Sequence, residues 1–355
     1  MADLIYGFHQ LADIDANRRI GEEGILPRVT EAVEMAMAEY NRQMDSMLGL
    51  FVNRTTQYKL KYKAPASSRS QPLDQNGRAR PIKSGITYDT AFPIQGSGAA
   101  WGTNFVTKTM MTVEEANNAT KTLQDGDTRW MSDHIMAALF AGSTWTYNDE
   151  EFGSLTINPL ANGDSREFAR TGSALAGTDN HLLAQAADIS DAANPFPTIH
   201  QELTEHPDNS GEVVVMVATD LVSDIEGLAT FKEKSDGNVE QGANSDRLVG
   251  TAPSNVPGRL IGYVQGCWVY EWNSMPSGYM LATMTGANKA LLMREYPVAA
   301  LQGFNLVGER NDHPFYESQY ARWAGFGTFN GVGALVYRIG NASYATPSGF
   351  ASPMP

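Results

Sequence analysis

Imidazole and carboxylate side chains are densest between positions 200 and 208. His200, Glu202, Glu205, His206 and Asp208 all carry groups that bind divalent metals, and a zinc site needs three or four such groups to converge. The two histidines are six residues apart, whereas a His-Glu-x-x-His site places them four apart on one helix face. We therefore interpret this group as a solvated helix end. A metal-dependent hydrolase is kept as an alternative, which would lose its zinc in the double variant His200→Ala, His206→Ala.

Other reactive motifs are weak. The glycines of Gly325-Phe326-Gly327, Gly331 and Gly333 do not have the Gly-x-Gly-x-x-Gly spacing of a dinucleotide site, and they favour loop and strand backbone. The sequence contains neither Gly-x-Ser-x-Gly nor a P-loop. Cys267 is its single cysteine, so no intramolecular disulfide forms, and its apolar neighbours predict a buried thiol. We expect no catalytic residue, no cofactor and no metal.

A cationic segment occurs within an acidic chain. Nine basic and two acidic residues lie between Arg54 and Lys108, although the whole chain has a net charge of −14. Apolar and charged residues alternate from Gln57 to Lys63, Asn76-Gly77 is a turn signal, and Ile86, Tyr88 and Phe92 follow, which together predict a long hairpin. The candidate contact residues on it are Tyr58, Lys59, Lys61, Lys63, Arg69, Arg78, Arg80 and Lys83.

Such a hairpin needs support, because an isolated two-stranded ribbon is marginal in water. Its charge predicts an acidic neighbour, and residues 109–355 hold 29 acidic and 13 basic residues. A solvated hairpin packed on its own domain is the alternative. The net negative charge also argues against direct, sequence-independent binding of nucleic acid. No apolar run reaches the roughly 18 residues of a membrane span, and the N-terminus lacks the pattern of a secretion signal.

The remaining patterns predict an α+β fold. A helix is expected over 27–51, and a second follows Thr112, where Thr112 and Glu115 match a capping box. Residues 145–193 favour loops and short elements. Beyond them we expect a helix over 196–206, a buried strand over 212–218, a helix over 220–232 capped by Thr219, and a turn at 234–238. Buried strands are expected over 260–264, 267–270, 279–284, 291–295, 304–310 and 333–339, with a Pro-Gly turn at 274–278.

Four segments in this order resemble the major capsid proteins of tailed bacteriophages with the HK97 fold. Thr120 to Thr144 resembles the spine helix of that family with its small-residue exit. Val213 to Asn238 resembles the strand, helix and turn of the axial domain. Gly258 to Gly278 resembles the Leu-Leu-Gly-Tyr-Pro and Asn-Ala-Met-Pro-Ala-Gly segments, although Tyr263 is followed by Val264 rather than by proline. The final strands of the family are matched by 287–295 and 331–339.

The resemblance implies a domain order for this chain. Residues 1–26 would be an extended N-terminal arm, 27–51 an amphipathic helix of the peripheral domain, and 52–98 the extended loop. The spine helix and peripheral domain would occupy 99–150, an uncertain insert 151–195, the axial domain 196–284, the return to the peripheral domain 285–340, and a tail 341–355.

The resemblance also implies a structural role without enzymatic activity. Copies of the chain would form pentamers and hexamers of an icosahedral shell around double-stranded DNA, assembled in the host cytoplasm, with only indirect contact to the genome and none to a membrane. Portal and decoration proteins would be partners. A scaffold would be a separate protein or already removed, because only 26 residues precede the first expected helix. An encapsulin-like nanocompartment that encloses a cargo enzyme is the alternative within the same fold.

Overall fold

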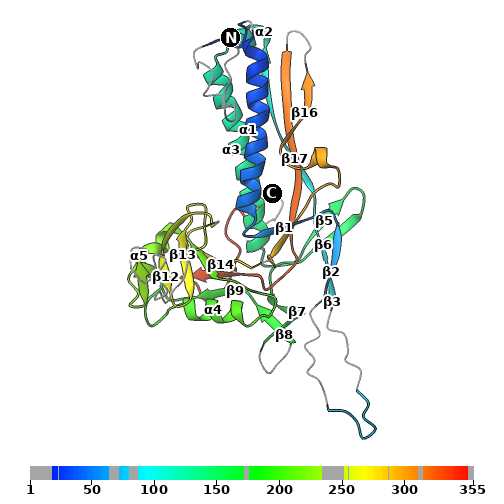
Figure 1. Cartoon of the computed structure of the whole chain (residues 1–355). Coiled ribbons are helices and arrows are strands. Elements are labelled where there is room, and N and C mark those ends of the chain that lie inside the picture. The colour runs from blue at the N-terminus through cyan, green and yellow to red at the C-terminus, as the bar shows by residue number, and fades with distance from the viewer. Residues whose placement is uncertain are drawn as a thin grey trace. The chain divides into compact units, whose positions relative to one another are not determined.

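The computed structural model describes residues 18–22, 24–63, 72–79, 87–171, 176–233, 252–254, 256–286, 288–310 and 315–350. Helices and strands are mixed along this chain, as expected for an α+β fold. Two compact units can be followed along the colours of Figure 1. The first consists of 1–46, 94–134 and 295–325, and the second of 47–93, 135–294 and 326–355.

Two long helices form the core of the first unit. α1 (Ile25–Leu48) and α3 (Val113–Phe140) lie side by side in Figure 1, and Val29 and Ala32 of α1 pack with Val113 and Ala116 of α3. Among the described residues, no helix is apolar enough over a sufficient length to cross a membrane.

The described part of the N-terminal segment differs from the expected extended arm. Ile20 is buried in the same core as the two helices. Its backbone N–H donates to the Met111 carbonyl at 2.9 Å, and the Val113 N–H donates to the Arg18 carbonyl at 3.0 Å. Burial of Ile20 and these two hydrogen bonds fix the segment, which a pattern of scattered polar residues does not reveal.

The predicted capping box begins α3. Thr112 Oγ1 accepts from the Glu115 N–H at 3.2 Å, and the Glu115 carboxylate accepts from the Thr112 N–H at 2.9 Å. These bonds satisfy two of the N–H groups that a helix start leaves unpaired. The helix continues unbroken through the exposed Gly126, where an added Cβ would meet no neighbour within 4 Å.

A three-stranded arrangement completes the first unit, and the sequence analysis missed two of its strands. β4 (Gln95–Asn104) pairs antiparallel with β17 (Phe315–Thr328), which pairs antiparallel with β16 (Asn305–Arg310). Glycines weaken the strand signal of β4, but Gly96 is required there, because a Cβ would lie 2.8 Å from the Trp323 indole nitrogen. Two short helices lie nearby in the chain, α2 (Phe105–Met110) and η3 (Ala299–Leu301).

A seven-stranded sheet forms the core of the second unit. Its order is β11-β12-β13-β10-β14-β18-β9. All five residues of the central strand β10 (Val213–Val217) are buried, and helix α4 (Phe196–Thr204) packs on the sheet through Phe196, Ile199 and Leu203. The other strands are β9 (Leu182–Gln185), β11 (Phe231–Glu233), β12 (Arg259–Val264), β13 (Cys267–Glu271), β14 (Tyr279–Met284) and β18 (Ala334–Ile339).

This sheet bears on two expectations. The Pro-Gly segment joins β13 to β14 as expected, and β10 lies between these two strands, parallel to β13 and antiparallel to β14. The expected helix over 220–232 is replaced by η2 (Thr219–Leu221), the short α5 (Val222–Glu226) and then β11. No side-chain cap by Thr219 is formed; its hydroxyl lies 3.4 Å from the Asn273 amide oxygen. The expected turn at 234–238 lies outside the described residues.

Residues 145–193, for which loops and short elements were expected, contain short strands. β5 (Trp145–Asp149) pairs with β6 (Gly153–Ile157), and β7 (Asn162–Ala169) pairs with β8 (Ala176–Asn180). Their Gly, Asn, Asp and Ser content disfavours strands by local propensity, so cross-strand pairing overrides it. The unit also contains β1 (Val52–Thr55), which pairs in parallel with β15 (Leu291–Arg294), and the hairpin of β2 (Lys59–Lys63) and β3 (Thr87–Ala91).

A buried ion pair joins α1, α3 and β17 inside the first unit. The guanidinium of Arg322 donates to both carboxylate oxygens of Asp127, at 3.0 and 2.9 Å, and both side chains are at most 1% exposed. Arg322 also donates to the Asn41 amide oxygen at 3.1 Å, and the Tyr40 hydroxyl donates to Asp127 at 2.8 Å. α1, α3 and β17 therefore each contribute a hydrogen-bond or ion-pair partner to the buried charges of Asp127 and Arg322.

Replacing Arg322 by Met should leave the Asp127 carboxylate buried without its cation. Loss of one partner of a buried ion pair costs about 3–5 kcal/mol, so the free energy of unfolding should fall by that amount in urea titrations. The control Arg28→Met changes an exposed arginine of α1 and should alter stability by less than about 0.5 kcal/mol. Equal effects of the two variants would contradict the assigned role.

Candidate interaction surfaces and a buried polar network

The root of the β2–β3 hairpin is anchored by aromatic stacking. Tyr62 pairs in register with Tyr88, and their rings stack at 4.8 Å between centroids. Tyr62 also meets the edges of Phe168 and Phe329, and its hydroxyl donates to the Asp208 carboxylate at 3.0 Å. The face of the hairpin that carries Tyr62 is therefore held by its own unit.

Two of the sequence-predicted contact residues have partners within the same unit. Lys59 forms an exposed ion pair with Asp89 of β3 at 2.8 Å, which raises the pKa of the lysine. Tyr58 stacks on Phe152 of the β5–β6 turn, with ring centroids 3.9 Å apart. Lys61 is exposed on β2.

The described loop segment 72–79 forms a tight, exposed turn. Asp74 Oδ1 accepts from the N–H groups of Asn76 and Arg78, and the Asp74 N–H donates to the Arg78 carbonyl. Gly77 has φ of 73°, a conformation that favours glycine. All eight residues are exposed, including Arg78 and Leu73, which is 61% exposed. The Asn-Gly turn signal is thus confirmed. Arg69, Arg80, Lys83 and the side chain of Lys63 lie outside the described residues.

A buried ion pair clamps the root of the hairpin. Arg294 donates to Asp149 Oδ2 at 2.8 Å and to the Phe92 carbonyl at 3.1 Å, and its guanidinium lies over the Phe152 ring. Burial pushes the pKa of Asp149 up. Hydrogen bonds from Arg294 and from the Phe152 and Glu151 amides outweigh that effect, so its pKa lies below the usual range.

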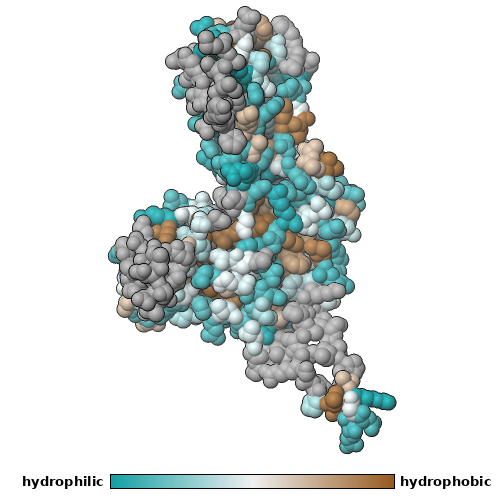
Figure 2. Space-filling view, in the orientation of Figure 1, coloured by the Kyte–Doolittle hydropathy of each residue, from teal (hydrophilic) through white to brown (hydrophobic). Residues whose placement is uncertain are grey.

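An apolar groove lies in the first unit between α1, α3 and the β16–β17 strands. Its volume is about 390 Å³. The lining includes Val33 and Met37 of α1, Leu123 of α3, and Leu306 and Tyr320 of the strands. Leu306 is 44% exposed. Figure 2 shows mostly hydrophilic residues on the face it presents, with brown apolar residues in small scattered groups. A groove with this lining offers apolar area of the kind that protein contacts bury.

Two exposed carboxylates border this groove. Glu34 of α1 and Glu309 of β16 both line it. Burial raises the pKa of Tyr320, and the negative charges of Glu309 and Glu34 raise it further, as expected when both face the same ring. Lys108 also lines the groove, with its ammonium over the Tyr316 ring at 4.5 Å. The groove combines an apolar floor with a border that carries the Glu34 and Glu309 carboxylates and the Lys108 ammonium.

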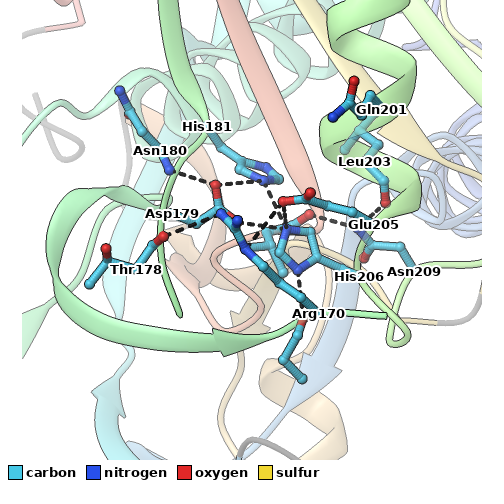
Figure 3. A network of polar contacts seen from close by, with 12 residues as sticks. Arg170, Thr178, Asp179, Asn180, His181, Gln201, Leu203, Glu205, His206 and Asn209 are labelled. Atoms are coloured by element: carbon cyan, nitrogen blue, oxygen red, sulfur yellow. Dashed lines mark hydrogen bonds and ion pairs between the residues drawn. The ribbon is translucent and has the colours of Figure 1, made fainter. Parts of the chain in front are cut away.

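A buried polar network occupies the second unit beside the seven-stranded sheet (Figure 3). His181, between β8 and β9, and His206, after α4, are at most 1% exposed. Their Nε2 atoms face each other at 3.3 Å, and His206 Nε2 lies 2.9 Å from Asp179 Oδ2. Arg170 contacts Asp179 Oδ2 at 2.9 Å and Glu205 Oε1 at 3.3 Å.

Burial and charge act in opposite directions in this network. Burial lowers the pKa of His181 to about 4 against the attraction of Asp179, so this imidazole is neutral at pH 7. Burial pushes the pKa of Asp179 up, but its close contact with His206 holds it well below its usual range. Burial raises the pKa of Glu202, and repulsion from Asp179 and Glu205 adds to the shift.

The metal-ligand group suggested by the sequence is divided in the structure. Glu205 and His206 belong to the network, and Glu202 lies beside it. Asp208 accepts from Tyr62 instead, and His200 lies against Gly266. The sequence did not indicate that Asp179, His181 and Arg170 belong to this network. Cys267 is buried, and burial raises the pKa of its thiol to about 12.

Comparison with solved structures identifies a shared fold. The structure described as Mycobacterium phage Patience aligns with a TM-score of 0.65 and 17% identity, covering 100% of this chain and 99% of that one. The asymmetric unit of the bacteriophage PhiM1 mature capsid aligns with a TM-score of 0.49 and 12% identity, covering 82% of this chain and 85% of that one. No family model matches the sequence, and no curated protein matches it either.

Replacing Asp149 by Asn should destabilise the hairpin root by about 3–5 kcal/mol at pH 7, because Arg294 keeps a buried charge without its counterion. A lowered carboxyl pKa contributes stability above the unfolded pKa of about 3.9, and this contribution is lost as pH falls through the folded pKa. The stability difference between wild type and variant, measured by urea unfolding at several pH values, should therefore shrink below about pH 4. A difference that does not change with pH would contradict the assignment.

Proposed function

We propose that this chain is the shell-forming subunit of a tailed-phage capsid with the HK97 fold. The observation that carries the proposal is the full-length match to the Mycobacterium phage Patience structure. The root of the hairpin is held within its own unit, whereas the loop segment 72–79 is exposed throughout. This exposed segment carries Arg78 on an anionic chain, and an exposed cation of this kind suits contact with another copy of that chain.

In this proposal each part of the chain has a role in the shell. The hairpin within 52–98 is the extended loop. The helices and strands of 27–51, 99–150 and 285–328 form the peripheral domain, with α3 as its spine, whereas β18 belongs to the seven-stranded sheet. The seven-stranded sheet and the helix that packs on it, which take in most of 196–284, form the axial domain. Through this domain the subunits of each pentamer or hexamer meet at its symmetry axis. Buried apolar area repeated by symmetry then supplies most of the strength of the shell.

The occupant that we propose for the groove is the loop segment 72–79 of a neighbouring copy. Leu73 of that loop is apolar and exposed, as the floor of the groove requires. Arg78 of the same loop is exposed and has the opposite charge to Glu34 and Glu309 at the border of the groove. Apolar contact supplies affinity, and the charges set the register of the loop.

The proposed partners follow from the proposed shell. The shell encloses double-stranded DNA and meets a portal protein, decoration proteins and, during assembly in the host cytoplasm, a separate scaffolding protein. An acidic subunit repels DNA, so contact with the genome is indirect.

Charge reversal tests the loop-to-groove contact. Arg78→Glu should weaken assembly, and so should the pair Glu34→Lys with Glu309→Lys, because each change places like charges together. All three changes in one chain should restore part of the assembly, since opposite charges meet again. Individual exposed pairs contribute about 0.2–1 kcal/mol, and the effect is repeated at every copy around a ring. Sedimentation velocity of the purified variants measures the fraction assembled.

Lys121→Glu is the matched control, because it reverses an exposed charge on α3 that does not line the groove. It should assemble as the wild type does. If the triple variant assembles no better than either parent, the groove does not bind this loop, and the proposed contact is wrong even if shells still form.

The purified subunit should not bind double-stranded DNA at physiological salt. An acidic protein lacks the clustered cations that displace counterions from phosphates. Fluorescence anisotropy with a labelled duplex measures this directly. Tight binding at about 150 mM salt would contradict the proposed indirect contact with the genome.

A further inference from the structure

The two histidines of the buried network are oriented in the same way. His181 Nδ1 lies 2.9 Å from the Ala334 carbonyl, and His206 Nδ1 lies 2.8 Å from the Ala169 carbonyl. A carbonyl only accepts, so both Nδ1 atoms carry a proton, and Nε2 is the atom of each ring that is left to bind a proton or a metal. This backbone-bonded orientation is the one that metal-ligating histidines adopt.

The Nε2 atoms and the Asp179 carboxylate converge on one point. The two Nε2 atoms are 3.3 Å apart, Asp179 Oδ2 is 2.9 Å from His206 Nε2, and Asp179 Oδ1 is 3.9 Å from His181 Nε2. Two lone pairs that face each other repel unless a proton or a cation lies between them. Ligands bound tetrahedrally at about 2.0–2.1 Å stand roughly 3.3–3.4 Å apart, so the spacing of the nitrogens fits a metal of zinc's size.

The charges nearby favour a dication. Asp179, Glu202 and Glu205 each bring a carboxylate oxygen to within 4.8 Å of the others. Arg170 is the cation that contacts Asp179 and Glu205. One guanidinium leaves the three carboxylates with two uncompensated negative charges when all are ionised. Asp179 Oδ2 and Glu205 Oε1 are both buried and accept no hydrogen bond of good geometry.

We propose that Asp179, His181 and His206 bind a zinc ion, with Glu205 as the fourth ligand. Glu205 Oε1 lies 3.8 Å from His206 Nε2, close enough to join with a small side-chain rotation. Imidazole nitrogen and carboxylate oxygen in a tetrahedral set suit Zn²⁺. Arg170 stays as an outer partner, since each carboxylate oxygen has a second lone pair.

The role of this ion is structural. The three ligands are between 0% and 6% exposed, which leaves no access for a substrate. The ligands and the carbonyls behind them come from β7, β8, the residue between β8 and β9, the segment after α4, and β18. One ion would therefore tie the β7–β8 hairpin to the large sheet, whether or not the chain assembles into shells.

The test uses the untagged full chain, stripped with a chelator and titrated with ZnCl₂ by isothermal calorimetry. We expect one zinc per chain, confirmed by elemental analysis after gel filtration, and a rise in Tm at saturating zinc. Substituting Co²⁺ should give the visible absorption of four-coordinate cobalt. Asp179→Asn and His206→Gln should each weaken zinc binding by more than the roughly 10–100-fold that loss of an outer partner costs.

His200→Ala is the matched control, because His200 lies on α4 but contacts Gly266 rather than the network. It should bind zinc with unchanged stoichiometry and affinity. Failure of the folded wild type to bind zinc would overturn the proposal. A proton shared between the two Nε2 atoms would then explain their close approach. Zinc that is retained in Asp179→Asn and His206→Gln, or lost in His200→Ala, would overturn it as well, because the ion would then bind elsewhere.

Discussion

The cost of removing a charge from water is the constraint on which much of this structure depends. A buried carboxylate or guanidinium is tolerated only beside a partner that compensates it. Arg322 with Asp127 meets this requirement in the first unit, and Arg294 with Asp149 meets it at the root of the hairpin. Both pairs join elements that are far apart in sequence. They therefore specify which segments meet, while apolar burial supplies most of the stability.

The same cost of desolvation distinguishes the buried charges of the chain from the exposed charges on its candidate contact surface. The described loop carries its charge where water already solvates it, and the acidic border of the groove is exposed as well. Charges of this kind add little to the stability of one subunit. In the proposed shell they act when a second copy approaches, because complementary charges guide association and fix orientation. This division between buried and exposed charge agrees with the proposed role of a self-assembling subunit.

Local signals predicted the elements that local physics determines. The capping box at Thr112, the apolar spacing of α1 and the Asn-Gly turn all depend on residues within a few positions of one another. β4 and β17 were missed because their glycines weaken the strand signal. Their stability comes from pairing with each other, although the paired residues are more than 200 positions apart in the sequence. The insertion of β10 between β13 and β14 was missed for the same reason, since adjacent patterns in a sequence do not reveal a distant partner.

The buried network illustrates the same limit for a site. The sequence drew attention to Glu205 and His206, but it grouped them with neighbours along α4. Their partners Asp179 and His181 lie about 25 positions earlier and meet them only after β8, β9 and α4 have folded. The alternating positions of Asp179 and His181 place both on one side of an extended backbone, which is the only local signal that was available.

Self-association is the property that tests the central claim most directly. Sedimentation velocity of the purified chain over a range of concentrations, with negative-stain electron microscopy of any large species, measures it. The account predicts rings of five or six subunits, or closed shells. A chain that remains monomeric at every concentration, with and without added crowding agent, would contradict it.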